Sequence, residues 1–311
     1  MMKTVVTLLI CLVILFAAVP VFACSTQHAP SGHAWGWHHG WAKGGGTPPA
    51  TPDYQDLWWR SPAGSESGWG VNLTQQGDIL FATWFTYDAG GNGQWLVMSR
   101  GDMVSANTYS GTLYRTTGPA FDAQPWNPDA VEQTPAGSAT FSFADGNNGT
   151  FSYTLDGVSQ SKPITRTVYA SPVPTCVQAE TFAPASNYSD LWWRSPAASE
   201  SGWGVNVTQQ GDILFATWFT YDASGKGLWL VMSRGEKTAP GIYSGTLYRT
   251  AGPAFDAATW DPRLVTQTPV GFATFTFTDP ANGTFAYTVN GVSQSKAITR
   301  DAYATPVTVC N

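Results

Sequence analysis

Histidine is missing from residues 40–311, and its absence removes much of enzyme chemistry from most of the chain. The four histidines all lie earlier, at His28, His33, His38 and His39. Catalytic triads built on histidine and histidine-ligated metal sites are therefore excluded from the later part. The chain also lacks a G-x-S-x-G elbow, a Walker loop, a C-x-x-C pair and an EF-hand loop. We accordingly expect no catalytic residue, no metal site and no cofactor.

Charge is scarce as well. Only 12% of the residues are charged, 14% are aromatic, and the net charge is −6. A negative chain offers no basic surface to a nucleic-acid backbone, so no nucleic-acid partner is expected. Few charges combined with many aromatic, Thr, Ser and Gly residues are typical of β-rich extracellular domains and argue against disorder.

The N-terminus carries the pattern of an export signal. Lys3 precedes the mostly apolar run Val5–Val19, and Val21-Phe22-Ala23 fits a signal-peptidase site. This run is too short for a stable membrane span, and no later stretch reaches the roughly 18 apolar residues that a transmembrane helix needs. We expect residues 1–23 to be a signal peptide and the mature protein to be exported.

Three cysteines remain once Cys11 leaves with the signal peptide, and an odd number in an exported protein asks for an explanation. Val21-Phe22-Ala23-Cys24 resembles a bacterial lipobox, although Phe22 is unusual there. On this reading Cys24 is acylated and anchors the chain in the outer membrane, while Cys176 and Cys310 form a disulfide. The alternative is a secreted or periplasmic protein with one free or intermolecular thiol.

The chain is a tandem duplication. Residues 54–177 recur as residues 188–311 at a constant offset of 134, with about seven positions in ten identical. This period exceeds the roughly 20–50 residues of solenoid repeats and matches a whole domain of about 100–150 residues. Residues 178–187 form a short linker between the copies. Residues 24–53, rich in Gly, His, Trp and Pro, are typical of a flexible tether rather than of a closed metal site.

Each copy predicts an all-β domain that could fold alone. Eight short runs rich in Val, Thr, Tyr, Phe and Trp alternate with turn residues such as Gln76-Gly77-Asp78 and Asp156-Gly157. Strands joined by short hairpins favour an antiparallel meander that closes into an up-and-down barrel. An immunoglobulin-like β-sandwich is the alternative, although its Cys…Trp…Cys spacing is missing.

Two segments of each copy depart from the simple meander. The strand near 79–87 is apolar on both faces, so the sister domain or a Pro-rich segment must cover its outer face. Thr117–Gly137 contains four prolines, which predict a long irregular connection.

Glu66 is the only glutamate that recurs, as Glu200, and it stands in a Ser/Gly-rich turn between tryptophans. A carboxylate beside aromatic rings can hold a polyhydroxylated ligand by combining hydrogen bonds with stacking. We therefore expect a ligand surface at one barrel mouth, formed by Trp59, Glu66, Trp69, Trp193, Glu200 and Trp203. The competing interpretation is structural, with Arg60 or Arg100 as the ionic partner of Glu66.

The run WWRSPA…ESGWGVN…TQQGDILFATWFTYD resembles a repeat found in exported proteins of Gram-negative bacteria. The resemblance covers both copies, nearly everything after residue 53. It implies a location in the bacterial envelope and contributes no catalytic residue.

Three classes of function follow from these features. The first is a non-catalytic envelope protein that binds a small molecule, a glycan or an envelope protein, touching the membrane only through an anchor at Cys24. The alternative is a hydrolase of cell-wall or other glycans, with Glu66 and an aspartate as acid and base. A purely structural envelope protein would need no ligand site at all.

Overall fold

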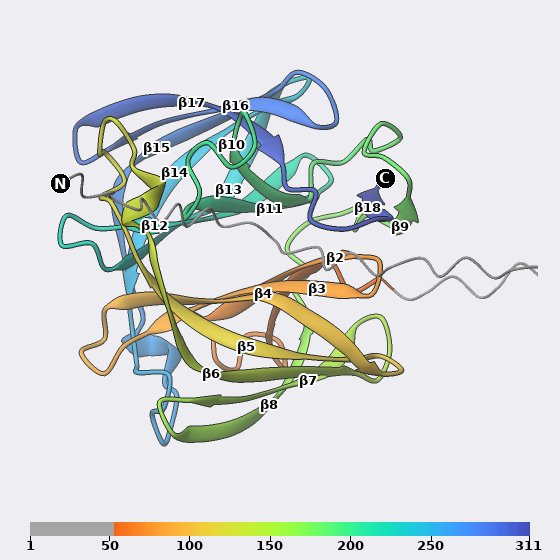
Figure 1. The fold of residues 1–311 in the computed structure, drawn as a ribbon, viewed down its shortest axis with the longest axis vertical. Helices are drawn as coiled ribbons and strands as arrows, with labels where there is room; N and C mark the ends of the chain where they lie inside the picture. The colour runs from red at the N-terminus through yellow and green to blue at the C-terminus, as the bar shows by residue number, and fades with distance from the viewer. Residues whose placement is uncertain (1–52) are drawn as a thin grey trace, which may run out of the picture. The chain divides into compact units, whose positions relative to one another are not determined.

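The computed structural model describes residues 53–311, which form two closed antiparallel barrels of eight strands each and a separate two-stranded sheet (Figure 1). Cys24, the expected signal peptide and the His/Trp-rich tract lie outside the described residues. The first barrel consists of β1 (Asp56–Arg60), β2 (Gly70–Gln76), β3 (Ile79–Tyr87), β4 (Gly93–Ser105), β5 (Thr108–Thr117), β6 (Glu132–Phe143), β7 (Asn148–Leu155) and β8 (Val158–Arg166).

The second barrel repeats this order. It consists of β10 (Asp190–Arg194), β11 (Gly204–Gln210), β12 (Ile213–Tyr221), β13 (Gly227–Ala239), β14 (Ile242–Ala251), β15 (Thr266–Phe277), β16 (Asn282–Val289) and β17 (Val292–Arg300). Every strand pairs with its sequence neighbours, and the last closes on the first, as in the pairing of β1 with β8. The predicted up-and-down barrels are thus confirmed, and the sandwich alternative is wrong.

The start of β6 differs from the sequence prediction in an instructive way. β6 begins at Glu132, within the segment that its prolines had marked as irregular. Pro135 lies opposite Tyr114 at a register shift, where the ladder is locally broken and a missing N–H is tolerated. The irregular connection therefore shrinks to residues 118–131, with one short 3-10 turn at Pro128–Ala130.

Aromatic side chains fill the inside of each barrel. In the first barrel Trp58, Trp84, Phe141 and Phe151 are buried, and the rings of Phe141 and Phe151 stack with centroids 4.7 Å apart. The inward residues alternate with outward ones along each strand, as the pleat requires. The barrel interior is therefore a packed core.

The outer faces of the two barrels pack on each other through reciprocal contacts. Trp95 lies 5.5 Å from Phe219, and its repeat equivalent Trp229 lies 4.9 Å from Phe85. The indole N–H of Trp95 donates to the Thr220 carbonyl at 2.9 Å, and that of Trp229 donates to the Thr86 carbonyl at 3.1 Å. Contacts that recur with the copies exchanged define an isologous interface, like that of a two-fold dimer. The sister copy thus covers the outer face of β3, as its two-sided apolar pattern predicted.

Each barrel also receives a loop from its sister. We call residues 118–131 and 252–265 the exchange loops. Phe255 of the second exchange loop is a member of the first barrel's core, 6.0 Å from Trp84 between ring centroids. Trp260 stacks on Tyr87 at 5.9 Å and donates its indole N–H to the Ser67 carbonyl at 3.1 Å.

The reverse exchange is equivalent. Phe121 packs 5.8 Å from Trp218, and Trp126 donates to the Ser201 carbonyl at 3.1 Å. Gly202 must be glycine because a Cβ there, at φ +109°, would stand 2.5 Å from Cγ2 of Val131. Each barrel is closed by its own strands, but its mouth is filled by side chains of the other copy.

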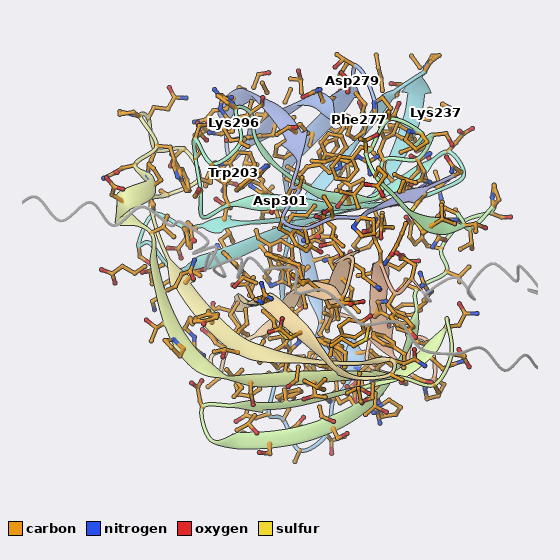
Figure 2. The ribbon with its side chains drawn as sticks, turned by 45° about the vertical axis from the view of Figure 1, so that its right-hand side comes forward. Trp203, Lys237, Phe277, Asp279, Lys296 and Asp301 are labelled. Carbon is orange, nitrogen blue, oxygen red and sulfur yellow. A yellow bond between two sulfur atoms is a disulfide. The ribbon has the colours of Figure 1, made fainter. Side chains whose placement is uncertain are left out.

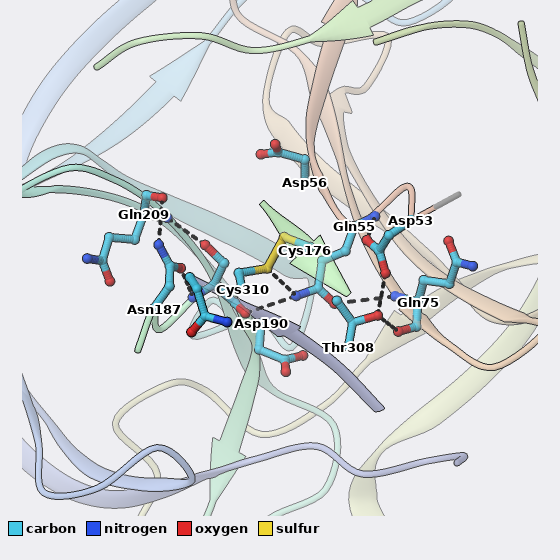
Figure 3. Close-up of a disulfide and its surroundings, with 12 residues drawn as sticks. Asp53, Gln55, Asp56, Gln75, Cys176, Asn187, Asp190, Gln209, Thr308 and Cys310 are labelled. Atoms are coloured by element: carbon cyan, nitrogen blue, oxygen red, sulfur yellow. Dashed lines mark hydrogen bonds between the residues drawn. A yellow bond between two sulfur atoms is a disulfide. The ribbon is translucent and has the colours of Figure 1, made fainter. Parts of the chain in front are cut away.

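The chain ends of the two copies meet at a disulfide. β9 (Cys176–Ala179) pairs with β18 (Val307–Cys310), and the predicted bond between Cys176 and Cys310 is confirmed (Figure 3). Thr175 and Asn311 exchange two backbone hydrogen bonds just beyond it. The two cysteines are repeat equivalents, so the bond lies on the approximate two-fold axis that relates the two copies. β9 itself was not predicted, and it extends across the expected boundary at residue 177 into the linker.

An isolated first copy, residues 54–177, is expected to form a homodimer. Phe121, Trp126 and Val131 are the same residue types as Phe255, Trp260 and Val265, so a second identical chain can fill the empty mouth. Sedimentation velocity would measure the mass, and the matched Trp126→Ala variant should shift it toward monomer. A stable monomer with native aromatic circular dichroism would contradict the shared core.

Candidate functional site

Glu66 lies at the mouth of the first barrel in a network of three partners. Its Oε2 accepts hydrogen bonds from Lys162 Nζ at 2.8 Å and from Trp69 Nε1 at 3.0 Å. Its Oε1 lies 3.4 Å from Arg60 Nε, and the carboxylate side chain is 15% exposed. The interpretation with Arg60 as ionic partner is thus confirmed, while Arg100 bonds instead to Asp102 at 2.9 Å.

The strand geometry explains why Lys162 reaches this carboxylate. Lys162 on β8 stands opposite Phe151, whose side chain is buried in the core, so the lysine also points inward. Its ammonium lies 5.4 Å from the centre of the Trp69 ring, within cation–π range. A largely desolvated ammonium needs a counter-ion, and Glu66 supplies it to the partly buried Lys162.

The second copy repeats the network with Glu200. Lys296 Nζ lies 2.6 Å from Glu200, Trp203 donates its indole N–H at 3.0 Å, and Arg194 lies 3.4 Å away. Figure 2 shows Lys296 and Trp203 on the same side of the second barrel, away from Lys237 and Asp279. The network is therefore a property of the repeat.

The six predicted ligand residues do not form one surface. Glu66 and Trp69 touch, as do their equivalents Glu200 and Trp203, but Trp69 is only 3% exposed. Trp59 follows the inward-facing Trp58 and so lies on the outer face of β1, as Trp193 does on β10. The exchange loop of the sister copy packs on the turn that carries Glu66, through Trp260 and Ser67. A binding role for these residues stays a prediction.

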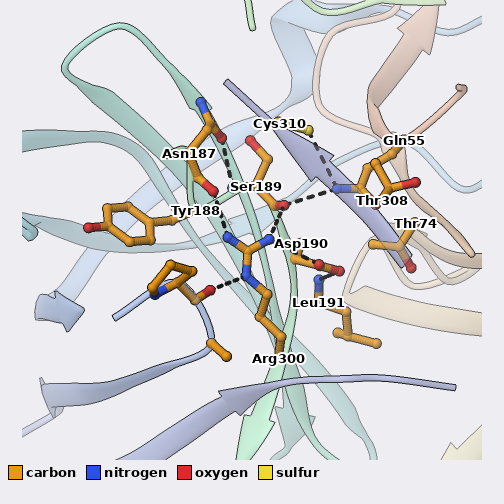
Figure 4. Close-up of polar contacts among 12 residues, drawn as sticks. Gln55, Thr74, Asn187, Tyr188, Ser189, Asp190, Leu191, Arg300, Thr308 and Cys310 are labelled. Atoms are coloured by element: carbon orange, nitrogen blue, oxygen red, sulfur yellow. Dashed lines mark hydrogen bonds and ion pairs between the residues drawn. The ribbon is translucent and has the colours of Figure 1, made fainter. Parts of the chain in front are cut away.

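A second group of charges is buried near the disulfide. Arg300 has no exposed side-chain surface and lies 3.1 Å from Asp190, while donating to the carbonyls of Asn187, Ser189 and Pro280 (Figure 4). Burial raises the pKa of Asp190 to about 6, against the opposing effect of Arg300. The first copy repeats the pair as Arg166 and Asp56, at 3.1 Å. Because the guanidinium group of Arg300 pairs with a carboxylate and also donates to three carbonyls, this group of contacts holds the ends of strands together.

Asp301 is a half-buried carboxylate with no equivalent, since Thr167 stands at its place in the first copy. Burial, and then the negative charge of Asp190, raises the pKa of Asp301 to about 7. Its backbone carries structural bonds: the N–H donates to Leu191 at 2.9 Å and the carbonyl accepts from Gln76 at 2.6 Å. At neutral pH the charged side chain therefore lowers the free energy of unfolding.

An array of hydroxyl side chains lies on the outer side of β5–β8. Three rows of four aligned positions cross these strands, and every position except Pro163 carries Ser or Thr. The rows are Thr108, Ser142, Thr150, Pro163; Ser110, Thr140, Ser152, Ser161; and Thr112, Ser138, Thr154, Ser159. We call this array the first hydroxyl face. The alternate residues, such as Phe141 and Tyr153, are core residues, so the hydroxyls face outward.

A shallow hollow lies on this face in both copies. In the first copy it measures ≈ 400 Å³ and is lined by Ser138, Thr140, Ser152, Tyr153, Thr154, Ser159, Gln160 and Ser161. In the second copy it measures ≈ 450 Å³ and is lined by the eight equivalent residues, from Phe272 to Ser295. No lining residue is charged in either hollow.

The hydroxyls of the face are ordered by bonds among themselves. The Oγ atoms of Ser152 and Ser161 share a hydrogen bond of 2.9 Å, and the hydroxyls of Thr154 and Ser159 share one of 2.8 Å. A hydroxyl can donate once and accept twice, so each bonded pair still offers one O–H and several lone pairs outward. Such a surface matches ligands that both donate and accept hydrogen bonds.

Sequence reasoning missed the hydroxyl face, although a signal existed. Ser or Thr alternates with buried residues in TYSGT, SATFS and TFSYT, three segments of consecutive strands. Serine and threonine are ordinary on the exposed side of a strand, and only the register aligns them into rows.

Comparisons with protein-family models, with curated proteins and with solved structures found no match to this chain. Within residues 53–311, no group of three or more His, Cys, Asp or Glu side chains is placed to hold a metal ion. No helix in this part of the chain is long and apolar enough to cross a membrane.

Replacing Glu66 should destabilise the first barrel. Glu66→Gln leaves Lys162 partly buried without a counter-ion, which costs on the order of 3 kcal/mol for a buried pair. Urea denaturation would measure the loss. Asp102→Asn breaks the exposed pair with Arg100 and is the matched control, with an expected cost below about 1 kcal/mol. Equal effects of the two changes would show that the Glu66 network contributes nothing special.

Asp301→Thr, which installs the residue of the first copy, should stabilise the protein at pH 8 more than at pH 5. The folded-state pKa lies above the ordinary value, so the folded state binds more protons than the unfolded state between about pH 4 and pH 7. Stability of the unmodified protein therefore falls as pH rises through this window, by at least about 1 kcal/mol from this group. Thermal melts across pH would measure the difference, and a gain independent of pH would contradict it.

Proposed function

We propose that this chain is an exported, non-catalytic protein that binds a neutral glycan through the first hydroxyl face and the equivalent face of the second copy. The observation that carries the proposal is the recurrence of one uncharged, hydroxyl-lined hollow at equivalent positions of both copies. Sugars present dense hydroxyl groups without charge, which is the complement of such a surface. Export is supported by the signal pattern of residues 1–23 and by the disulfide, which oxidising compartments favour.

The duplication supports binding of a polymer. Two faces in one chain can engage repeated units of the same glycan, and the second contact is then intramolecular. Weak binding at each shallow hollow can in this way add up to useful retention. An extended neutral polysaccharide benefits more from this arrangement than a small molecule does.

The second candidate function is hydrolysis of a glycan. A glycosidase needs a pair of carboxylates, one of which exchanges a proton with the substrate. Glu66, the candidate acid, is engaged by Lys162, Arg60 and Trp69, and the exchange loop packs on its turn. These contacts favour a structural role for the carboxylate over a role as the acid of a glycosidase.

The test is affinity electrophoresis of the mature chain in gels containing a neutral polysaccharide. Dextran, galactomannan and hydroxyethylcellulose are suitable neutral polymers, and alginate is the charged comparison. We expect at least one neutral polymer to retard the unmodified chain. The double variant Thr140→Lys, Thr274→Lys should no longer be retarded, because charged side chains would enter both hollows. Val104→Lys, at an exposed position of β4 outside the face, is the matched control and should bind normally. Equal mobility of all variants, or no retardation of the unmodified chain, would contradict the proposal.

A further inference from the structure

The two hydroxyl faces have diverged in chemistry. We call the equivalent surface of β14–β17 the second hydroxyl face. Of its twelve aligned positions, Ile242, Phe272, Ala286 and Ala297 carry no hydroxyl. Two of these, Phe272 and Ala286, line the hollow, where the first copy has Ser138 and Ser152. The second hollow has thus exchanged hydroxyls for apolar surface.

Phe272 is exposed in a way that the fold does not require. Its side chain is 50% exposed, and it is the only aromatic residue among the exposed large hydrophobic residues within positions 53–311. It stands on β15 between Thr246 and Thr288, and the first barrel has the same strand with Ser138 at this place. Serine therefore serves the sheet equally well, so the strand itself does not require an aromatic ring at position 272.

We infer that Phe272 is a stacking platform for a sugar ring, which makes the second hydroxyl face the stronger of two unequal glycan subsites. This inference rests on the proposed function. One face of a pyranose ring presents C–H groups, which pack on an aromatic ring, while its edge carries hydroxyls. The same hollow supplies both halves of that contact, because Thr288 and Ser293 share a hydrogen bond of 2.7 Å beside the ring position.

The absence of charge in the second hollow determines which class of ligand it can bind. The hollow is lined by Phe272, Ala286, Tyr287, Gln294 and four hydroxyl residues, so nothing in it compensates an ionic ligand. A purely apolar partner would leave the hydroxyls unpaired, which costs binding free energy. A neutral polysaccharide chain satisfies both constraints, and its next units can continue along the rows of hydroxyls.

The experiment exchanges the two residues between the copies in the full mature chain. Phe272→Ser installs the residue of the first face, and Ser138→Phe installs the platform on it. Dissociation constants are measured by affinity electrophoresis with the neutral polymer that retards the unmodified chain best. Phe272→Ser should weaken binding by roughly tenfold, the effect of about 1.4 kcal/mol. Phe272→Tyr should retain it, and Ser138→Phe should strengthen it. Because both positions are exposed strand sites that tolerate either residue in this chain, melting temperatures should not change.

Three outcomes would overturn the inference. If Phe272→Ser binds normally while the lysine variants of the hydroxyl faces do not, the glycan is bound without stacking and only the proposed function stands. If no neutral polymer retards the unmodified chain, both fail together. If sedimentation velocity shows that the unmodified chain self-associates and Phe272→Ser does not, with polymer binding unaffected, the ring contacts a second copy of the chain.

Discussion

The exchange of loops between the barrels is the constraint on which the rest of the structure depends. Phe255 and Trp260 close the mouth of the first barrel, while Phe121 and Trp126 close that of the second. The outer faces of β3 and β12 are buried because the two barrels pack against each other there. Close approach explains Gly68 and Gly202, where the sister's Val265 and Val131 leave no room for a Cβ. The protein is therefore built as a dimer within a single chain.

Four cationic side chains of residues 53–311 lie inside the barrels or at their ends with a carboxylate partner. Lys162 and Lys296 point into the barrels and are neutralised by Glu66 and Glu200. Arg166 and Arg300 are neutralised by Asp56 and Asp190 at the opposite ends of the barrels. The residues that line the two hydroxyl hollows, by contrast, are all uncharged. Asp301 differs from these carboxylates because only burial and the negative charge of Asp190 act on it, and it is present in one copy only.

Much of the fold could be predicted from the sequence because its signals are local. Turn residues such as Asp156-Gly157 marked the hairpins, the two-sided apolar pattern of 79–87 demanded a cover, and the parity and repeat equivalence of cysteines pointed to Cys176 and Cys310. The exchange loops could not be foreseen, since an irregular Pro-rich segment does not reveal which mouth it enters. Lys162 was missed because it lies 96 residues from Glu66, and inward orientation follows only from strand register. The hydroxyl faces were missed for the same reason.

The disulfide joins equivalent positions of the two copies, so it closes the association covalently at its centre. A two-fold dimer of separate chains dissociates on dilution, and its stability depends on protein concentration. Here the linker between the copies and the Cys176–Cys310 bond hold each exchange loop beside the barrel mouth that it fills, at a fixed effective concentration. The shared core therefore survives any dilution, and the two hydroxyl faces can change independently without putting the assembly that carries them at risk.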